Sequence, residues 1–243
     1  MNRPRLKKDF YGYLFVAPFL IGFLIFGLYP VVHTMGLSFT DTTLMKAESN
    51  FIGLKNFQRL FADKTFSTAI TNTWELWLMN FIPQLGISML LALWFTNTRL
   101  KIKGGGIWRM LFYMPNLMMP AAVAALFFSF FSFYGPVNQV LVRAGLQATA
   151  IDYIRSPAMM RGLVVFIQWW MWFGQTTILL MAAITSVSPA LYEAAVIDGA
   201  GTGQVFRYVT LPLIKPVMVF ILVTSLVGGM QMFDIPMLLT DGR

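Results

Sequence analysis

A polar and aromatic face interrupts one of the long apolar stretches of this sequence. Gln168, Trp172 and Gln175 are spaced four and three residues apart, so in a helix they share one face, with Met171 at its margin. Polar side chains at membrane depth are costly in lipid and tend to face a bundle interior or a pathway. Amides can pair with hydroxyls, and an indole ring can pack on the apolar side of a pyranose. This face therefore suits a sugar.

A second group of candidate binding residues follows near the end of the sequence. Gln231 comes one helical turn after Gly228, which could leave space for a ligand, and Asp234 follows another turn on. A different interpretation is open for both groups. The run "QWWMW" could anchor a helix at the membrane interface, and the glutamines could hydrogen-bond to neighbouring helices.

The sequence offers little for catalysis. It contains no H-E-x-x-H or G-x-S-x-G pattern, and its one histidine, His33, has no partner at metal-ligand spacing. It has no cysteine, which excludes thiol chemistry and disulfides. No phosphate-binding loop occurs, because "KGGGIWR" at Lys103–Arg109 lacks the required lysine placement. A membrane-embedded enzyme is therefore disfavoured, no metal site is expected, and a purely structural membrane subunit remains as a third class.

The elements that position these residues are expected to be membrane-spanning helices. Hydrophobic residues make up 57% of the sequence and charged residues 12%, with a mean hydropathy of +0.67. Each apolar run is near or beyond the ~20 residues that a helix needs to cross a bilayer. We therefore predict an all-α polytopic membrane protein with five spanning helices. The five runs are Tyr11–Phe39, Leu76–Phe95, Met110–Val142, Gly162–Tyr192 and Pro216–Phe233.

The basic residues set the expected orientation. The first two segments of one side are short and densely basic, with Arg3, Arg5, Lys7 and Lys8 before the first run and Arg99, Lys101, Lys103 and Arg109 before the third. Positive charge close to the spans marks the cytoplasmic side. The N-terminus is therefore expected in the cytoplasm. The net charge of +8 fits a lipid surface and not a nucleic acid, because the basic residues flank the spans and form no long patch.

A polar segment at about residues 188–212 separates the last two runs. Ser188-Pro189 resembles a helix start, "ALYEAAVID" continues it, and Gly199 and Gly201 offer stops. Ala190, Ala194 and Ile197 would form a narrow face of mostly small residues that another protein could approach closely. A further short helical turn is expected to end at Leu211-Pro212, where the chain re-enters the membrane. An ordinary solvated loop is the alternative.

The segment also carries a recognisable motif. Glu193-Ala194-Ala195, then Gly199, then "VTLP" ending at Pro212 closely resembles the EAA motif of permease subunits of ABC importers, with Val209 where the family usually has Ile. "FIGLKNFQRLF", "RMLFYMPNLMMPAAVA", "YGPVNQVL" and "LYEAAVIDGA" are similar to the sugar-permease, maltose-type branch. The resemblance implies a type I ABC importer transmembrane domain, a single permease domain over residues 1–243, in the bacterial inner membrane.

The resemblance implies that the EAA segment couples the chain to an ATPase. Ala194 and Ala195 would allow close approach to a cleft on the ATPase, Glu193 would offer a carboxylate to a basic partner, and Gly199 would permit the turn. Asp198 is expected to cap or brace that turn, and Leu211 and Pro212 complete the motif. ATP and Mg would be bound by the partner ATPase, so no cofactor is expected in this chain.

The implied partners are a cytoplasmic ATP-binding subunit dimer, a second and different permease subunit, an extracellular or periplasmic solute-binding protein and the lipid bilayer. The implied activity is ATP-driven import of a carbohydrate through a pathway of which this chain forms half. A permease for glycerol phosphate or a polyamine is the alternative, although a phosphate ester should demand cations at depth, and the runs contain none. The family continues past the match at Leu238–Gly242 into one more spanning helix, so we expect the sequence to be C-terminally incomplete.

Overall fold

The computed structural model describes residues 6–43, 50–97, 100 and 104–240. Contacts divide the chain into two compact units, residues 1–70 and 71–243, and each is described by itself. The structure is helical, as predicted, and β structure among the described residues is confined to one antiparallel bridge between Thr40 and Phe51. The predicted single domain over residues 1–243 stays a prediction.

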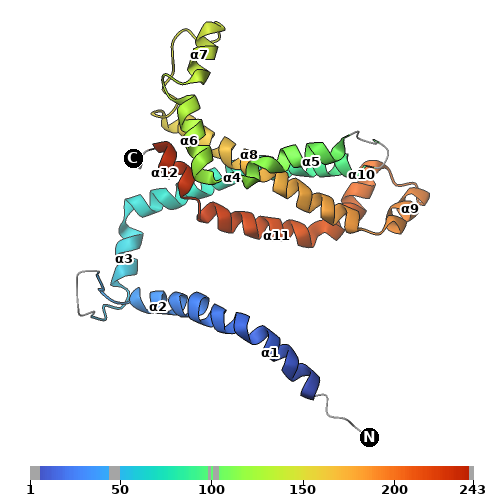
Figure 1. Cartoon of the computed structure of the whole chain (residues 1–243), viewed down its shortest axis with the longest axis horizontal. Coiled ribbons are helices and arrows are strands. Elements are labelled where there is room, and N and C mark those ends of the chain that lie inside the picture. The colour runs from blue at the N-terminus through green and yellow to red at the C-terminus, as the bar shows by residue number, and fades with distance from the viewer. Residues whose placement is uncertain (1–5, 44–49, 98–99, 101–103, 241–243) are drawn as a thin grey trace. The chain divides into compact units, whose positions relative to one another are not determined.

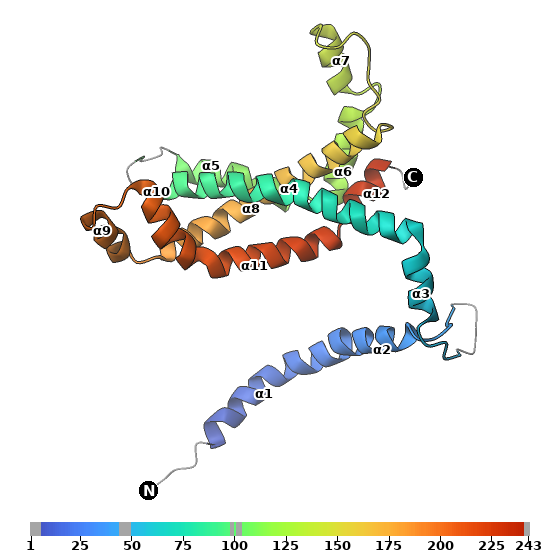
Figure 2. The same cartoon turned by 180° about the vertical axis from the view of Figure 1, so that it is seen from behind.

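Figures 1 and 2 show the helices from opposite sides. The first unit contains α1 (Leu6–Phe23), a π-helical turn (Leu24–Leu28), α2 (Tyr29–Leu37) and α3 (Lys55–Ala62), and α4 (Lys64–Thr96) leads out of it. The second unit continues with α5 (Gly105–Tyr113), a 3₁₀ turn (Met114–Leu117), α6 (Pro120–Phe131), α7 (Pro136–Arg143), α8 (Pro157–Ser186), α9 (Pro189–Ile197), α10 (Thr202–Val205), a π-helical turn (Phe206–Thr210), α11 (Leu211–Met230) and α12 (Asp234–Thr240).

Within the described ranges, five helical segments are long and apolar enough to cross a membrane, which confirms the predicted number. They are Tyr11–Leu37, Lys64–Thr96, Pro120–Arg143, Pro157–Ser186 and Thr202–Thr240. The second begins at Lys64, well before the predicted Leu76. Arg3, Arg5, Arg99, Lys101 and Lys103, on which the predicted orientation depends, lie outside the described residues, as does Gly242.

The third predicted helix, Met110–Val142, is wrong as one continuous element. The chain is extended at Met118 and Met119, with ψ 143° and 131°, and again at Ser132 and Gly135, with ψ 160° and 161°. Met119 and Gly135 precede Pro120 and Pro136, and a proline ring pushes the residue before it out of the helical region, whereas α6 has already ended at Phe131. Three shorter helices, α5, α6 and α7, therefore replace the single predicted one.

Two other prolines stand inside long helices, each just after a widened turn. Tyr29 donates its N–H to the carbonyl of Leu24 before Pro30, and Leu211 donates to that of Phe206 before Pro212. A proline in a helix lacks an N–H and its ring clashes with the carbonyl four residues earlier. The extra residue of a π-type turn relieves that clash. The predicted break at Leu211-Pro212 is therefore wrong, and the helix continues from Thr202 to Met230.

Three helices of the second unit, α4, α8 and α11, lie side by side and share a core (Figures 1 and 2). Its buried apolar residues are Trp77, Phe81, Met89 and Ala92 of α4, Leu180, Met181, Ala183 and Ile184 of α8, and Ile214 and Ile221 of α11. Helices in a membrane associate through close packing and hydrogen bonds. Ser88 donates from its Oγ to the carbonyl of Phe173, 2.8 Å away, and ties α4 to α8.

Close packing of α8 depends on a glycine. A Cβ atom added at Gly174 would lie 1.9 Å from the carbonyl oxygen of Phe112, so only a glycine lets the α5 backbone approach α8 this closely. A second apolar cluster joins α8 to α6 and α12. Its buried residues are Val123 and Ala124 of α6, Met160, Leu163, Val164, Ile167 and Met171 of α8, and Ile235 and Leu239 of α12.

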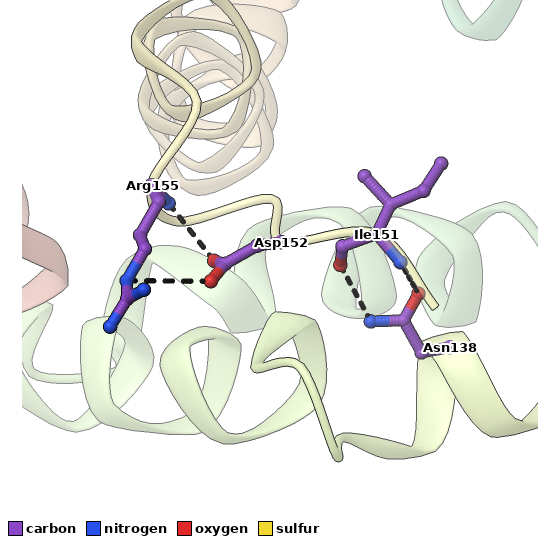
Figure 3. A network of polar contacts seen from close by, with 4 residues as sticks. All are labelled: Asn138, Ile151, Asp152 and Arg155. Atoms are coloured by element: carbon purple, nitrogen blue, oxygen red, sulfur yellow. Dashed lines mark hydrogen bonds and ion pairs between the residues drawn. The ribbon is translucent and has the colours of Figure 1, made fainter. Parts of the chain in front are cut away.

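The connection between α6 and α8 carries α7 and is tied together by one buried amide (Figure 3). Asn138, 2% exposed, donates from Nδ2 to the carbonyl of Ile151, 2.8 Å away, and accepts the N–H of Ile151 at its Oδ1, 3.0 Å away. Asp152 then accepts the N–H of Arg155 and faces its guanidinium, 3.6 Å away. The connection is therefore a folded hairpin and not a loose loop.

Candidate functional site

A cavity of ≈ 370 Å³ lies among α4, α8, α11 and the start of α12. All six predicted substrate-pathway residues line it: Gln168, Met171, Trp172, Gln175, Gly228 and Gln231. The structure thus brings together two groups that are far apart in the sequence. Their role in binding a substrate stays a prediction, but the geometry that it requires is present.

Helix α8 supplies one wall of the cavity with the predicted spacing. Gln168, Trp172 and Gln175 line it from successive turns, and the Trp172 side chain is 42% exposed. Met171 also lines the cavity but is 2% exposed, so it belongs mainly to the packed core behind this wall. The wall therefore offers two amide groups and the surface of one indole ring.

The other tryptophans of "QWWMW" have packing partners. Trp169 stacks on Phe173, with ring centroids 5.1 Å apart, and the Trp170 ring lies 5.8 Å from that of Phe127. Both residues are half-buried; Phe173 belongs to α8 itself, whereas Phe127 belongs to α6. These contacts do not test the alternative interpretation, in which the run anchors the helix at the membrane interface.

The second wall comes from the end of α11. A Cβ atom on Gly228 would meet nothing within 4 Å, so this position opens onto free space, as the sequence interpretation expects. The helix ends at Met230, and the N–H of Gln231 donates to the carbonyls of Val227 and Gly229. Asp234 begins α12, so it does not continue the helical turn of Gln231 as the spacing suggested. Both side chains nevertheless line the cavity.

Sequence reasoning missed a third wall on α4, formed by Trp77, Asn80 and Gln84. Trp77 Nε1 donates to Ser225 Oγ on α11 at 3.1 Å, and Gln84 Nε2 donates to Thr176 Oγ1 on α8 at 2.8 Å. The available signal was the pair of amides within the apolar run Leu76–Phe95. Which face of that run meets the cavity is set by contacts with other helices.

The cavity carries little charge. Among the described residues that line it, Asp234 is the one ionisable side chain, and neither lysine, arginine nor histidine is present. The other polar groups are amides and the hydroxyls of Thr176, Thr224 and Ser225. Such groups can donate and accept hydrogen bonds but cannot neutralise an anion. The cavity is therefore suited to a neutral, hydroxyl-rich molecule.

The predicted short helix with the EAA motif is present as α9. Ser188 occupies the N-cap position and Pro189 the first turn, although the Ser188 hydroxyl makes no capping hydrogen bond. Ala190, Glu193 and Ala194 are exposed, and Ile197 is 85% exposed, while Ala195 is half-buried. The expected face of small residues is thus open to a partner.

Gly199 ends α9 in the predicted manner. Its φ is +78°, in the left-handed region that favours glycine. Gly199 donates its N–H to the carbonyl of Val196, and Ala200 donates to that of Ala195, which is the hydrogen-bond pair of a Schellman motif. Asp198 is the C-cap residue through its backbone, and its carboxylate accepts no hydrogen bond from the described residues. The predicted bracing by Asp198 is therefore a backbone contribution.

The region after α9 connects it to α11. Thr210, 3% exposed, donates from its hydroxyl to the Tyr192 hydroxyl of α9, 3.4 Å away. Leu211 and Pro212 lie inside the helix that continues into α11. Along the chain, α9 therefore lies between α8 and α11, two of the helices that line the cavity.

Comparison with known proteins gives one family match. Residues 75–243 match the model of the family described as binding-protein-dependent transport system inner membrane component. The lactose transport system permease protein LacF of Rhizobium radiobacter is 32% identical over 244 residues, covering 99% of this chain and 80% of LacF. The arabinooligosaccharides transport system permease protein AraP of Bacillus subtilis is 33% identical over 224 residues, covering 91% of this chain and 69% of AraP.

A solved structure is similar as well. It is a bacterial alginate ABC transporter in complex with an alginate pentasaccharide-bound periplasmic protein. Its matching chain is 28% identical and superposes with a TM-score of 0.72, covering 90% of this chain and 72% of that one. The helical arrangement described above thus recurs in a protein of that kind.

Proposed function

The chain belongs to the inner-membrane components of binding-protein-dependent transport systems, and from this premise we propose that it forms half of the pathway for ATP-driven import of a neutral carbohydrate. It is a multi-pass membrane protein and a transport subunit, not an enzyme. The single observation that carries the proposal is the cavity, because it gathers amides, hydroxyls and one accessible indole from α4, α8 and α11.

The chemistry of a saccharide fits this cavity. Each sugar hydroxyl both donates and accepts, so it can pair with either end of an amide such as Gln175 or Gln231. The half-exposed ring of Trp172 can cover the apolar side of a pyranose. Relatives named for lactose and arabinooligosaccharide transport support a carbohydrate substrate. The single carboxylate of Asp234 and the lack of cations among the described lining residues support a neutral one.

We propose that α9 couples ATP hydrolysis to the pathway. Its exposed Ala194 and Glu193 would meet the ATPase subunit, with the alanine permitting close approach and the carboxylate facing a basic residue. The Schellman turn at Gly199 holds the helix at a fixed angle. The Tyr192–Thr210 hydrogen bond and the chain connections transmit its displacement to α8 and α11. ATP and Mg would be held by the partner, not by this chain.

The remaining assignments complete the same proposal. The partners would be an ATPase dimer, a second permease subunit and an external solute-binding protein, and the solved relative bound to a periplasmic protein supports the last of these. The N-terminus and α9 would lie in the cytoplasm, because the dense basic segments precede the first and third runs. The hairpin carrying α7 would then lie outside.

Glycerol phosphate or a polyamine is the alternative substrate class. A phosphate would face Asp234 with no lysine or arginine among the described lining residues to offset its charge. A polyamine would find one carboxylate for several ammonium groups. Both are therefore poorer matches than a sugar.

Uptake by the full-length transporter, reconstituted with its ATPase, second permease and binding protein, tests the proposal. Lactose, arabinotriose, glycerol 3-phosphate and putrescine are offered separately as labelled substrates. We expect ATP-dependent uptake of a saccharide, reduced on the order of 5- to 150-fold by Gln175→Leu, because an unmade buried hydrogen bond costs roughly 1–3 kcal/mol. Gln139→Leu on α7, away from the cavity, should leave uptake unchanged. Uptake of glycerol 3-phosphate or putrescine without any saccharide would refute the proposal.

A further inference from the structure

One polar side chain of the α4 wall has no hydrogen-bond partner. Trp77, Asn80 and Gln84 stand on one face of α4, and all three line the cavity. Two of them donate hydrogen bonds to other helices, Trp77 to Ser225 of α11 at 3.1 Å and Gln84 to Thr176 of α8 at 2.8 Å. Asn80, between them, is 9% exposed, and its Oδ1 is buried with no partner among the described residues.

The orientation of the Asn80 amide decides which of its two ends faces the cavity. The oxygen and nitrogen of an asparagine can be exchanged by rotation about χ2. In the orientation described, neither end of the Asn80 amide makes a hydrogen bond to the described residues, and its Oδ1 is the buried end. Buried polar groups in proteins are nearly always partnered, and lipid offers no substitute. Because Asn80 lines the cavity, a hydrogen-bonding group there, whether water or a ligand, can pair with the end of the amide that faces it.

We propose that Asn80 is a substrate-binding residue that receives a sugar hydroxyl, an inference that rests on the proposed carbohydrate pathway. A hydroxyl can accept from the Asn80 Nδ2 or, once the amide has rotated about χ2, donate to its Oδ1. The substrate is then held between two amide-bearing walls, α4 with Asn80 and α8 with Gln168 and Gln175. Trp77 and Gln84 fix the position of α4 and leave Asn80 free for the ligand.

The role predicts an unusual combination of effects for Asn80→Leu, which keeps the side-chain size but removes the amide. A structural asparagine loses stability when it is replaced, because its partners are left unsatisfied. Asn80 has no protein partner, so its replacement should not lower the melting temperature of the transporter. Substrate affinity, in contrast, should fall.

The experiment uses the full-length transporter, assembled with its ATPase and second permease in nanodiscs without ATP. Binding of lactose, trehalose and arabinotriose is measured by calorimetry for the parent, Asn80→Leu and the matched control Asn72→Leu. Asn72 is on the same helix, accepts a hydrogen bond from Arg161 at 2.7 Å and does not line the cavity. For the sugar that the parent binds, Kd should rise on the order of 5- to 150-fold in Asn80→Leu and stay within about twofold in Asn72→Leu.

Deoxy analogues of that sugar identify the contact itself. Removing the hydroxyl that meets Asn80 should weaken binding to the parent and leave binding to Asn80→Leu unchanged, because the partner is already gone. An unchanged Kd in Asn80→Leu overturns the inference. So does the result that every deoxy analogue loses as much affinity for Asn80→Leu as it loses for the parent. A lowered melting temperature with normal affinity assigns Asn80 to the fold and overturns it as well. A parent that binds none of the three sugars refutes the proposed function instead.

Discussion

Gly228 and Gly229, adjacent near the end of α11, should respond in opposite ways to the same substitution by alanine. A Cβ atom on Gly229 would lie 2.5 Å from Cδ1 and 3.0 Å from Cγ of Trp77, whereas one on Gly228 would meet nothing within 4 Å. Trp77 has little freedom to move aside. It is 7% exposed, its Nε1 is bonded to Ser225, and its ring stacks on Phe81 with centroids 5.1 Å apart.

The size of the difference follows from two terms. Replacing a helical glycine by alanine gains roughly 0.5–1 kcal/mol of helix propensity, and this gain is common to both positions. Overpacking a filled site costs typically about 1–3 kcal/mol and applies only to Gly229. Because the propensity cancels in the comparison, Gly229→Ala should be less stable than Gly228→Ala by about 1–3 kcal/mol.

The free energy of unfolding of the full-length subunit, measured by SDS titration in micelles, gives this difference directly. When each substitution is made separately in a Trp77→Leu background, most of the difference in stability should disappear, because the clashing ring is gone. Equal stabilities of the two variants in the native background, or a more stable Gly229→Ala, would show that α4 and α11 do not meet at Gly229 as described.

Three further outcomes are expected. In Gly199→Val the valine cannot adopt the φ of +78° without strain, so ATP hydrolysis should continue while sugar uptake falls. Unchanged uptake together with unchanged co-purification of the ATPase would exclude the coupling role. Gln231→Leu should reduce substrate-stimulated ATP hydrolysis on the order of 5- to 150-fold at limiting sugar and leave basal hydrolysis unchanged. A topology reporter inserted at Gly201 should read as cytoplasmic and one at Gly145 as external, and two signals on the same side would contradict the proposed orientation.

The sequence was sufficient where the information was local. The face of Gln168, Trp172 and Gln175 follows from helical spacing, and the structure places all three at the cavity. The helix α9 and its end at Gly199 follow from a proline at the start and a glycine at the stop, and both are confirmed. Pro115 and Pro120 predict a kink in the third run, but not its division into separate helices.

The sequence was not sufficient to predict features that depend on how one helix packs against another. Asn80 and Gln84 look alike within an apolar run, yet Gln84 bonds to Thr176 and Asn80 bonds to none of the described residues. That distinction depends on how α4 is turned against α8 and α11, and contacts such as Trp77 against Gly229 set this rotation. Likewise, the turn that accommodates Pro212 is a property of the whole helix and not of the Leu-Pro pair.

Protection of a cavity residue by substrate tests the central claim most directly. The 243 residues contain no cysteine, so a thiol introduced among them is unique within this stretch, and its modification is followed on its own peptide by mass spectrometry. Gln175→Cys and its control Ile178→Cys, which is on α8 but does not line the cavity, are treated in the full transporter with a charged methanethiosulfonate reagent. We predict that Gln175→Cys reacts, that the transported saccharide slows the reaction, and that Ile178→Cys is indifferent to the sugar. Modification of Gln175→Cys at the same rate with and without saturating saccharide would contradict the assignment of this cavity to the pathway.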